Sequence, residues 1–193
     1  MAWQTVKYQL KSLCPLLMHN GQTADPLNRY SKAMKQISGK RAKTDADYEE
    51  MARIEFMGAL YMAEDGPCIP TDVFDAVLIN GAKKSKEGPL AKSGVFTTKY
   101  ASLSYDGPRT ADLLWADETF RLVKRVKIGQ SSVMRTRPMF SKWEAIVELD
   151  YEPSIINPAR IDDWLEIAGV QVGLLDWRPQ YGRFLAERIA NGA

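Results

Sequence analysis

The sequence predicts an α+β fold whose core is a ferredoxin-like βαββαβ arrangement, and two observations support this. Apolar residues recur with a period of two or of about 3.6 in the order strand, helices, two strands, helix, strand. The chain has 193 residues, 45% of them hydrophobic, which is enough to bury the core of one domain. We therefore expect a single domain over residues 1–193, with an antiparallel sheet, a helical insertion after the first strand at about residues 26–84, and a protruding basic β-hairpin at about residues 120–150.

A strand followed by an amphipathic helix is predicted at the start of the chain. In residues 3–11 apolar and polar side chains alternate, and Pro15 ends the pattern. After Pro26, apolar residues recur at helical spacing, while Arg29 and Lys32 fall on another face. The helix after the first strand is therefore expected to have a basic side.

Two further helices are predicted before residue 85. Thr44 and Asp47 form a capping-box-like pair ahead of an apolar pattern that reaches Met62. Pro70 stands at the start of a third helical pattern. Residues 85–94 are polar and basic, and we expect a mobile loop there.

The second half of the chain begins with strand patterns. A short extended piece is expected at residues 101–105. Residues 121–128 and 143–149 each alternate apolar with charged side chains, as amphipathic strands do. The sequence therefore predicts two strands that flank a basic loop at residues 129–142.

A helix and a strand complete the predicted core. Asn157 is typical of an N-cap, Pro158 of the first helical position and Gly169 of a helix end. A loop and a last strand at residues 183–189 follow.

The charge is distributed unevenly along the chain. The formal net charge is only +2, but residues 120–143 contain seven basic residues and no Asp or Glu. This leaves 19 basic against 24 acidic residues elsewhere. A positive segment on an otherwise acidic chain can attract a polyanion locally while the rest of the surface repels unspecific contact.

The basic hairpin is the stronger of two candidate binding sites. Its cations are interleaved with aromatic and methionine side chains, the mixture that single-stranded nucleic acid requires for phosphate contact and base stacking. The predicted contacts here are Lys124, Arg125, Lys127, Arg135, Arg137, Phe140 and Lys142. The alternative is a solvated hairpin in which Phe140 and Trp143 belong to the core.

The second candidate site is the glycine-containing segment at residues 169–184. Glycine lets the backbone approach a ligand closely, and paired Arg and aromatic residues supply phosphate contact and stacking. The predicted contacts are Trp177, Arg178, Tyr181 and Arg183, with Arg29 and Lys32 of the basic helix in addition. The alternative is a loop held in place by its own aromatic residues.

No catalytic residue, metal site or cofactor is predicted. His19 is the only histidine, without an evident partner base, and neither Asp25 nor Asp176 has a second carboxylate placed to share a metal. Cys14 and Cys68 have neither zinc-site nor disulfide spacing. We expect a protein without enzymatic activity. A metal-independent endoribonuclease that uses His19 remains the enzymatic alternative.

Several stretches, in order, resemble the RAMP superfamily and in particular the repeated backbone subunit of CRISPR effector complexes. The opening strand and loop, LKSLCPLLMHNG, and the Ile-Pro motif with its helix, CIPTDVFDAVLINGAKK, are similar to that family. So are the hairpin VKRVKIGQSSVMRTRPMFSKWEAIVEL and the segment VGLLDWRPQYGRF, at the place of the family's glycine-rich loop. The resemblance implies an RRM-like sheet that binds a single strand, in subunits that stack along it as a filament or ring.

The expected function is non-catalytic binding of single-stranded nucleic acid, RNA or DNA, by a homo-oligomer. The resemblance suggests a stand-alone relative from a phage or another mobile element. A third hypothesis is a protein-interaction module, such as an inhibitor that mimics a CRISPR backbone subunit. No stretch approaches the roughly 18 consecutive apolar residues of a membrane span, and no signal peptide is recognisable, so we expect a soluble, cytoplasmic protein without a membrane partner.

Overall fold

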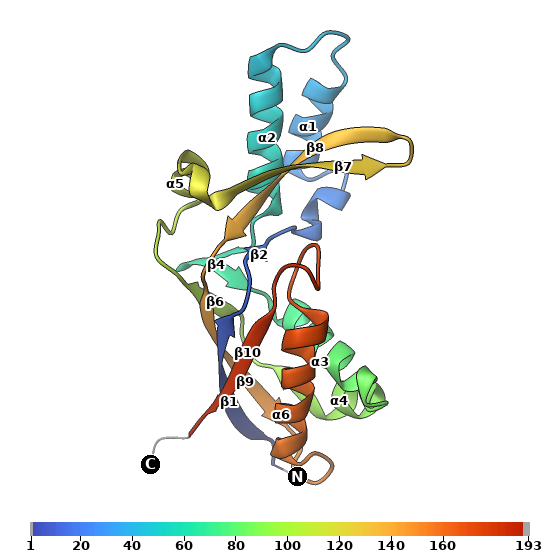
Figure 1. The fold of residues 1–193 in the computed structure, drawn as a ribbon, viewed down its shortest axis with the longest axis vertical. Helices are drawn as coiled ribbons and strands as arrows, with labels where there is room; N and C mark the ends of the chain where they lie inside the picture. The colour runs from blue at the N-terminus through green and yellow to red at the C-terminus, as the bar shows by residue number, and fades with distance from the viewer. Residues whose placement is uncertain (1, 191–193) are drawn as a thin grey trace.

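A mostly antiparallel sheet and six α-helices make up the computed structural model, which describes residues 2–190 (Figure 1). The α+β class expected from the sequence is therefore confirmed. The strands of the main sheet, in spatial order, are β10 (Phe184–Ile189), β1 (Gln4–Ser12), β9 (Glu144–Tyr151), β6 (Ala101–Ser104), β4 (Gly66–Ile69) and β3 (Met62–Ala63). Neighbouring strands are antiparallel, and β5 (Val95–Thr97) pairs with the far part of β9.

Strand β1 lies inside the sheet because it pairs along both edges. Its Tyr8 is opposite Val147 of β9 on one side and Arg188 of β10 on the other. The alternation seen in the sequence buries Val6, Tyr8 and Leu10 on one face and leaves polar residues on the other. The predicted first strand is thus confirmed, shifted by one residue.

Two helices cover the inner face of this sheet. They are α3 (Thr71–Lys84) and α6 (Pro158–Ile167), and they pack on each other (Figure 1). A side chain at Gly81 of α3 would overlap the backbone of Trp164, so glycine is what permits this close approach. Trp164 is fully buried and donates from Nε1 to Glu87 at 2.7 Å.

The other end of the molecule is built from a helical pair and a long hairpin (Figure 1). Helices α1 (Arg29–Ser38) and α2 (Asp45–Ala59) pack on each other, and α2 also packs on the hairpin. Strands β7 (Arg121–Ile128) and β8 (Ser131–Phe140) pair along their whole length, and β2 (Leu16–Leu17) extends this second sheet by pairing with the end of β8. The short helix α5 (Ala111–Ala116) precedes the hairpin.

The predicted helix starts are confirmed by their caps. Thr44 and Asp47 form both bonds of a capping box at α2, and the Asn157 side chain accepts from the backbone of Ala159 at the start of α6. At its other end α6 does not stop at Gly169, because a π-helical turn continues it over residues 168–172.

Three expectations about the chain's organisation were wrong or too broad. Residues 129–142 do not form a loop, because β8 continues to Phe140 and only a tight turn at Gly129 and Gln130 separates it from β7. Residues 88–94 form helix α4 (Gly88–Gly94), whose Ala91 is fully buried, instead of a mobile loop. Helix α3 belongs to the main sheet, so the helical insertion comprises α1 and α2 and is shorter than residues 26–84.

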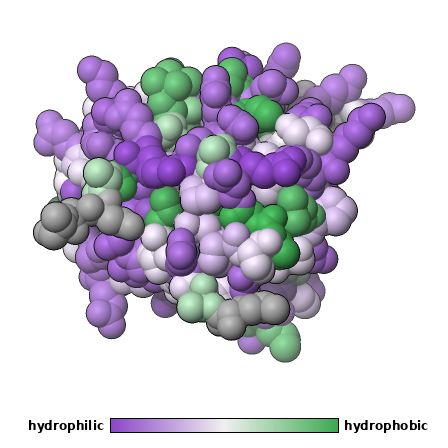
Figure 2. Space-filling model, turned by 90° about the horizontal axis from the view of Figure 1, so that it is seen from below, coloured by the Kyte–Doolittle hydropathy of each residue, from purple (hydrophilic) through white to green (hydrophobic). Residues whose placement is uncertain are grey.

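Hydrophilic side chains dominate the surface at one end of the molecule. Figure 2 views the end of the molecule at which β1 begins and β10 ends, and it shows mostly hydrophilic residues with smaller hydrophobic patches between them. None of the helices within residues 2–190 combines the length and apolar character needed to cross a membrane.

Candidate nucleic-acid interface

The hairpin carries exposed cations on both of its faces. Lys124, Arg125 and Lys127 of β7 are all exposed, and residues 120–143 contain no carboxylate that could neutralise them. In the register of the hairpin, Lys124 lies opposite Arg135, so both project from the same face. Because successive residues of a strand point to opposite faces, Arg125 and Lys127 project from the other face, about 7 Å apart.

The segment between α6 and β10 meets the hairpin at Lys124. The Lys124 ammonium lies 5.4 Å from the ring centroid of Trp177 and 6.0 Å from that of Tyr181. The two rings are themselves 6.0 Å apart in an edge-to-face arrangement, and both are partly exposed. The structure therefore brings together the two candidate sites that are separate in the sequence.

Two glycines shape this segment. Gly173 and Gly182 both have a φ of 75°, a region that favours glycine. Gly182 donates to the carbonyl of Pro15 at 2.8 Å and accepts from Leu174 at 2.9 Å, which ties the two ends of the segment together. At both glycines the chain's own backbone comes close: a Cβ at Gly182 would overlap the carbonyl of Leu174, and one at Gly173 that of Tyr181. The expected close approach to a ligand stays a prediction.

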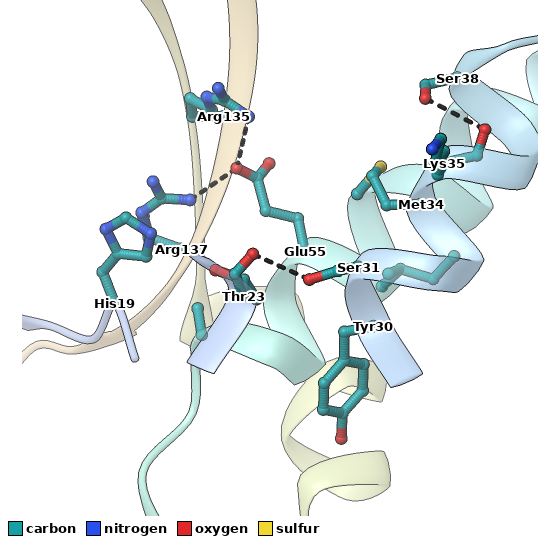
Figure 3. Close-up of a pocket in the computed structure, with 12 residues that line it drawn as sticks. His19, Thr23, Tyr30, Ser31, Met34, Lys35, Ser38, Glu55, Arg135 and Arg137 are labelled. Atoms are coloured by element: carbon teal, nitrogen blue, oxygen red, sulfur yellow. Dashed lines mark hydrogen bonds and ion pairs between the residues drawn. The ribbon is translucent and has the colours of Figure 1, made fainter. Parts of the chain in front are cut away.

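A buried ion cluster anchors the hairpin to both neighbouring elements (Figure 3). Arg137 is only 5% exposed, and it donates from Nη1 to Glu55 of α2 at 2.7 Å and from Nε to Asp176 at 2.9 Å. Glu55 also accepts from Arg135 at 3.1 Å and from the backbone of Thr136 at 2.9 Å. The predicted phosphate contact by Arg137 is therefore wrong, because its guanidinium is committed to internal carboxylates.

Phe140 and Trp143 are core residues. Each is 1% exposed; the Phe140 ring packs 4.9 Å from that of Tyr105, and Trp143 donates to the carbonyl of Cys14 at 3.2 Å. The prediction that Phe140 stacks on bases is therefore wrong, and the alternative of a core role holds for both. Base stacking is open to Trp177 and Tyr181 instead.

Five other predicted contact residues are exposed, and they are distributed over different parts of the fold. Arg29 and Lys32 lie on α1, where the Arg29 guanidinium sits 4.6 Å from the centroid of its neighbour Tyr30. Lys142 lies in the turn before β9, beside a hollow that Lys11 also lines. Arg178 lies between the rings of Trp177 and Tyr181 in sequence, and Arg183 directly precedes β10. Of these, only Arg178 and Arg183 belong to the segment between α6 and β10.

The outer face of the main sheet does not have the character of a nucleic-acid platform. Its lysines are paired: Lys7 with Glu148 at 3.0 Å and Lys11 with Glu187 at 2.7 Å. Lys99 also reaches Glu148, at 3.4 Å. Since carboxylates offset the lysines on this face, it offers a polyanion no excess of positive charge.

His19 borders a cavity next to the ion cluster. Its Nδ1 lies 3.7 Å from Asp176 Oδ2, beyond hydrogen-bonding distance, and its side chain is 45% exposed. Partial burial lowers the pKa of His19, and the Arg137 guanidinium lowers it further. Asp25 lies elsewhere, where its carboxylate accepts from the backbone of Leu27 in a local turn.

Sequence reasoning missed Glu55, the carboxylate that accepts hydrogen bonds from both Arg135 and Arg137. Nothing local marks it, because an acidic residue in a charged helix is ordinary and its partners are about 80 positions further along the chain.

Within residues 2–190 no group of three or more His, Cys, Asp or Glu side chains is placed to hold a metal ion, and both cysteines are free. No protein-family model matches the chain, and no curated protein is significantly similar to it.

Proposed function

We propose that this protein binds single-stranded nucleic acid, without catalysis, along the basic hairpin and the segment between α6 and β10. The observation that carries the proposal is the position of Lys124 beside the rings of Trp177 and Tyr181. Cations for phosphates and aromatic faces for bases are the two elements of single-strand recognition, and here they are adjacent. The proposed contacts are Lys124, Arg125, Lys127, Arg135, Trp177, Arg178 and Tyr181.

The strand order supports a ferredoxin-like core. Strands β1 and β6 run parallel with β9 between them, and α3 lies in their connection. Strands β9 and β10 likewise run parallel with β1 between them, and α6 connects them. Two such split βαβ units constitute the ferredoxin-like fold, so we propose this fold and with it a distant RAMP relationship.

The proposed binding mode differs from the RRM-like mode in the position of the nucleic acid. We propose that the nucleic acid follows the hairpin and not the outer face of the main sheet, whose lysines are already paired. Assembly into a homo-oligomer along the nucleic-acid strand is part of the proposal. The residues outside the hairpin are acidic on balance, opposite in sign to the hairpin of a second copy.

The first test measures the binding of labelled oligo-U, oligo-dT and duplex DNA by fluorescence anisotropy across a salt series. We expect cooperative binding to a single strand, with log affinity falling by about 0.7 per contacted phosphate per unit of log salt. Equal affinity for the duplex would contradict the proposal. No binding to any of the three at low salt would favour the protein-interaction hypothesis instead.

Trp177→Ala is expected to weaken single-strand binding by about 1–3 kcal/mol while leaving the salt dependence unchanged. The reason is that the substitution removes a stacking surface and no charge. Trp3→Ala is the matched control, since Trp3 is an exposed tryptophan that packs on Phe96, away from the hairpin. If the two variants lose the same affinity, Trp177 does not stack on bases.

The endoribonuclease alternative is favoured by one observation, the proximity of His19 to Asp176. A histidine whose pKa is lowered is neutral near pH 7 and can act as a base. Under the non-catalytic proposal, end-labelled RNA incubated with the wild type stays intact. Cleavage by the wild type that is lost in His19→Ala would establish the alternative.

A further inference from the structure

A cavity of about 420 Å³ lies between α1, α2 and β8 (Figure 3). Its walls come from the consecutive helices α1 and α2 and from the distant strand β8, and they include Lys35, Glu55 and Arg135. His19 stands at its border. Small-molecule sites usually measure about 300–1,000 Å³. The cavity is therefore large enough for a ligand of nucleotide size.

The lining of the cavity carries more cations than carboxylates. Three basic side chains, Lys35, Arg135 and Arg137, line it together with one carboxylate, that of Glu55. Arg137 pairs with Asp176 as well as with Glu55, and Arg135 pairs with Glu55, so these two carboxylates offset the two arginines. No ion pair or side-chain hydrogen bond within residues 2–190 engages the Lys35 ammonium, which supplies the excess positive charge and is available to an anion.

The lining of the cavity also has an apolar part. Met34, Ile54 and Ala59 line the cavity together with the ring of Tyr30. A bare inorganic anion gains nothing from apolar side chains, whereas an organic group attached to the anion buries surface against them. The hydroxyl of Ser31 also lines the cavity and can accept a further hydrogen bond.

We propose that this cavity binds a phosphomonoester on a nucleoside-sized group, with Lys35 and Arg135 holding the phosphate and Met34 and Ile54 contacting the organic part. The ligand is either a free mononucleotide or the phosphorylated end of a single strand. The site shares Arg135 with the proposed strand binding, but binding of a free monophosphate does not require the proposed function to hold.

Isothermal titration calorimetry with each of the four ribonucleoside 5′-monophosphates and the corresponding nucleosides tests the site. We expect at least one monophosphate to bind at least tenfold more tightly than its nucleoside and than inorganic phosphate. Lys35→Ala should weaken that binding at least tenfold, whereas Lys92→Ala, an exposed lysine of α4 at the other end of the molecule, should leave it unchanged. Binding of no monophosphate above its nucleoside, or binding insensitive to Lys35→Ala, overturns the proposal.

Oligo-U carrying a phosphate at the 5′ end, at the 3′ end or at neither end distinguishes the two sources. A preference of tenfold or more for one phosphorylated end, lost in Lys35→Ala, identifies the strand end as the ligand. Equal affinity for the three oligonucleotides, with monophosphate binding retained, identifies a free mononucleotide. Failure of the unphosphorylated strand to bind at all, with monophosphate binding intact, refutes the proposed function and leaves the cavity site standing.

Discussion

Replacing Arg137 with methionine is expected to lower the free energy of unfolding by about 3–5 kcal/mol. The guanidinium is almost fully buried and satisfies two carboxylates from different elements, Glu55 and Asp176. Removing it leaves Asp176 without its arginine and Glu55 with only Arg135 and the Thr136 backbone, as two neighbouring, largely buried negative charges. Urea unfolding followed by tryptophan fluorescence measures the loss, since the chain contains five tryptophans.

Arg135→Met is the matched control, because Arg135 pairs with the same Glu55 but its side chain is 36% exposed. Because the site is partly exposed, water can replace Arg135 as a partner of Glu55. The free energy of unfolding should therefore fall by about 1 kcal/mol or less. Adding Glu55→Gln and Asp176→Asn to Arg137→Met should recover most of the stability, since the only charge then left unpaired is that of the partly exposed Arg135. A loss below that of Arg135→Met would show that Arg137 does not hold the cluster together.

The cluster also connects stability to the proposed function. Asp176 directly precedes Trp177, and its carboxylate is fixed by Arg137 of the hairpin. The ion pair thus sets the position of the aromatic segment relative to the strand that carries Lys124. We infer that Arg137 positions the interface without contacting nucleic acid itself.

Elements whose signal is local were predictable from the sequence. The alternation in β1 and the caps at Thr44 and Asn157 depend on neighbours within a few positions, and the structure agrees with them. Strand β8 was missed because its inward and outward positions do not alternate cleanly. Thr136, Arg137 and Pro138 are buried in succession where α2 covers the edge of the strand.

The site itself depends on long-range contacts that no local pattern encodes. Lys124 and Trp177 are more than 50 positions apart, as their numbers show, and each belongs to a separately recognised motif. The sequence distinguished the basic hairpin by its charge but could not separate its exposed cations from Arg137. That distinction required knowing that Glu55 and Asp176 converge on one guanidinium.

Substituting Lys124, Arg125 and Lys127 together with alanine is expected to lower single-strand affinity by about a hundredfold at 0.1 M salt. Each cation that contacts a phosphate contributes about 0.7 to the slope of log affinity against log salt, so removing three should lower the slope by about 2. Fluorescence anisotropy with the preferred oligonucleotide at four or more salt concentrations gives both quantities. All three side chains are exposed, so folding should be unaffected.

The matched control is the triple alanine variant of Lys83, Lys84 and Lys92, three exposed lysines of α3 and α4 that carry the same total charge. Both variants change the net charge of the protein equally, so a difference between them reports where the nucleic acid lies and not how strongly the whole molecule attracts it. Equal losses with equal slopes would mean unspecific attraction by net charge. A lower slope confined to the β7 variant would assign the phosphate contacts to the hairpin, because counterions are released only where phosphate and cation meet.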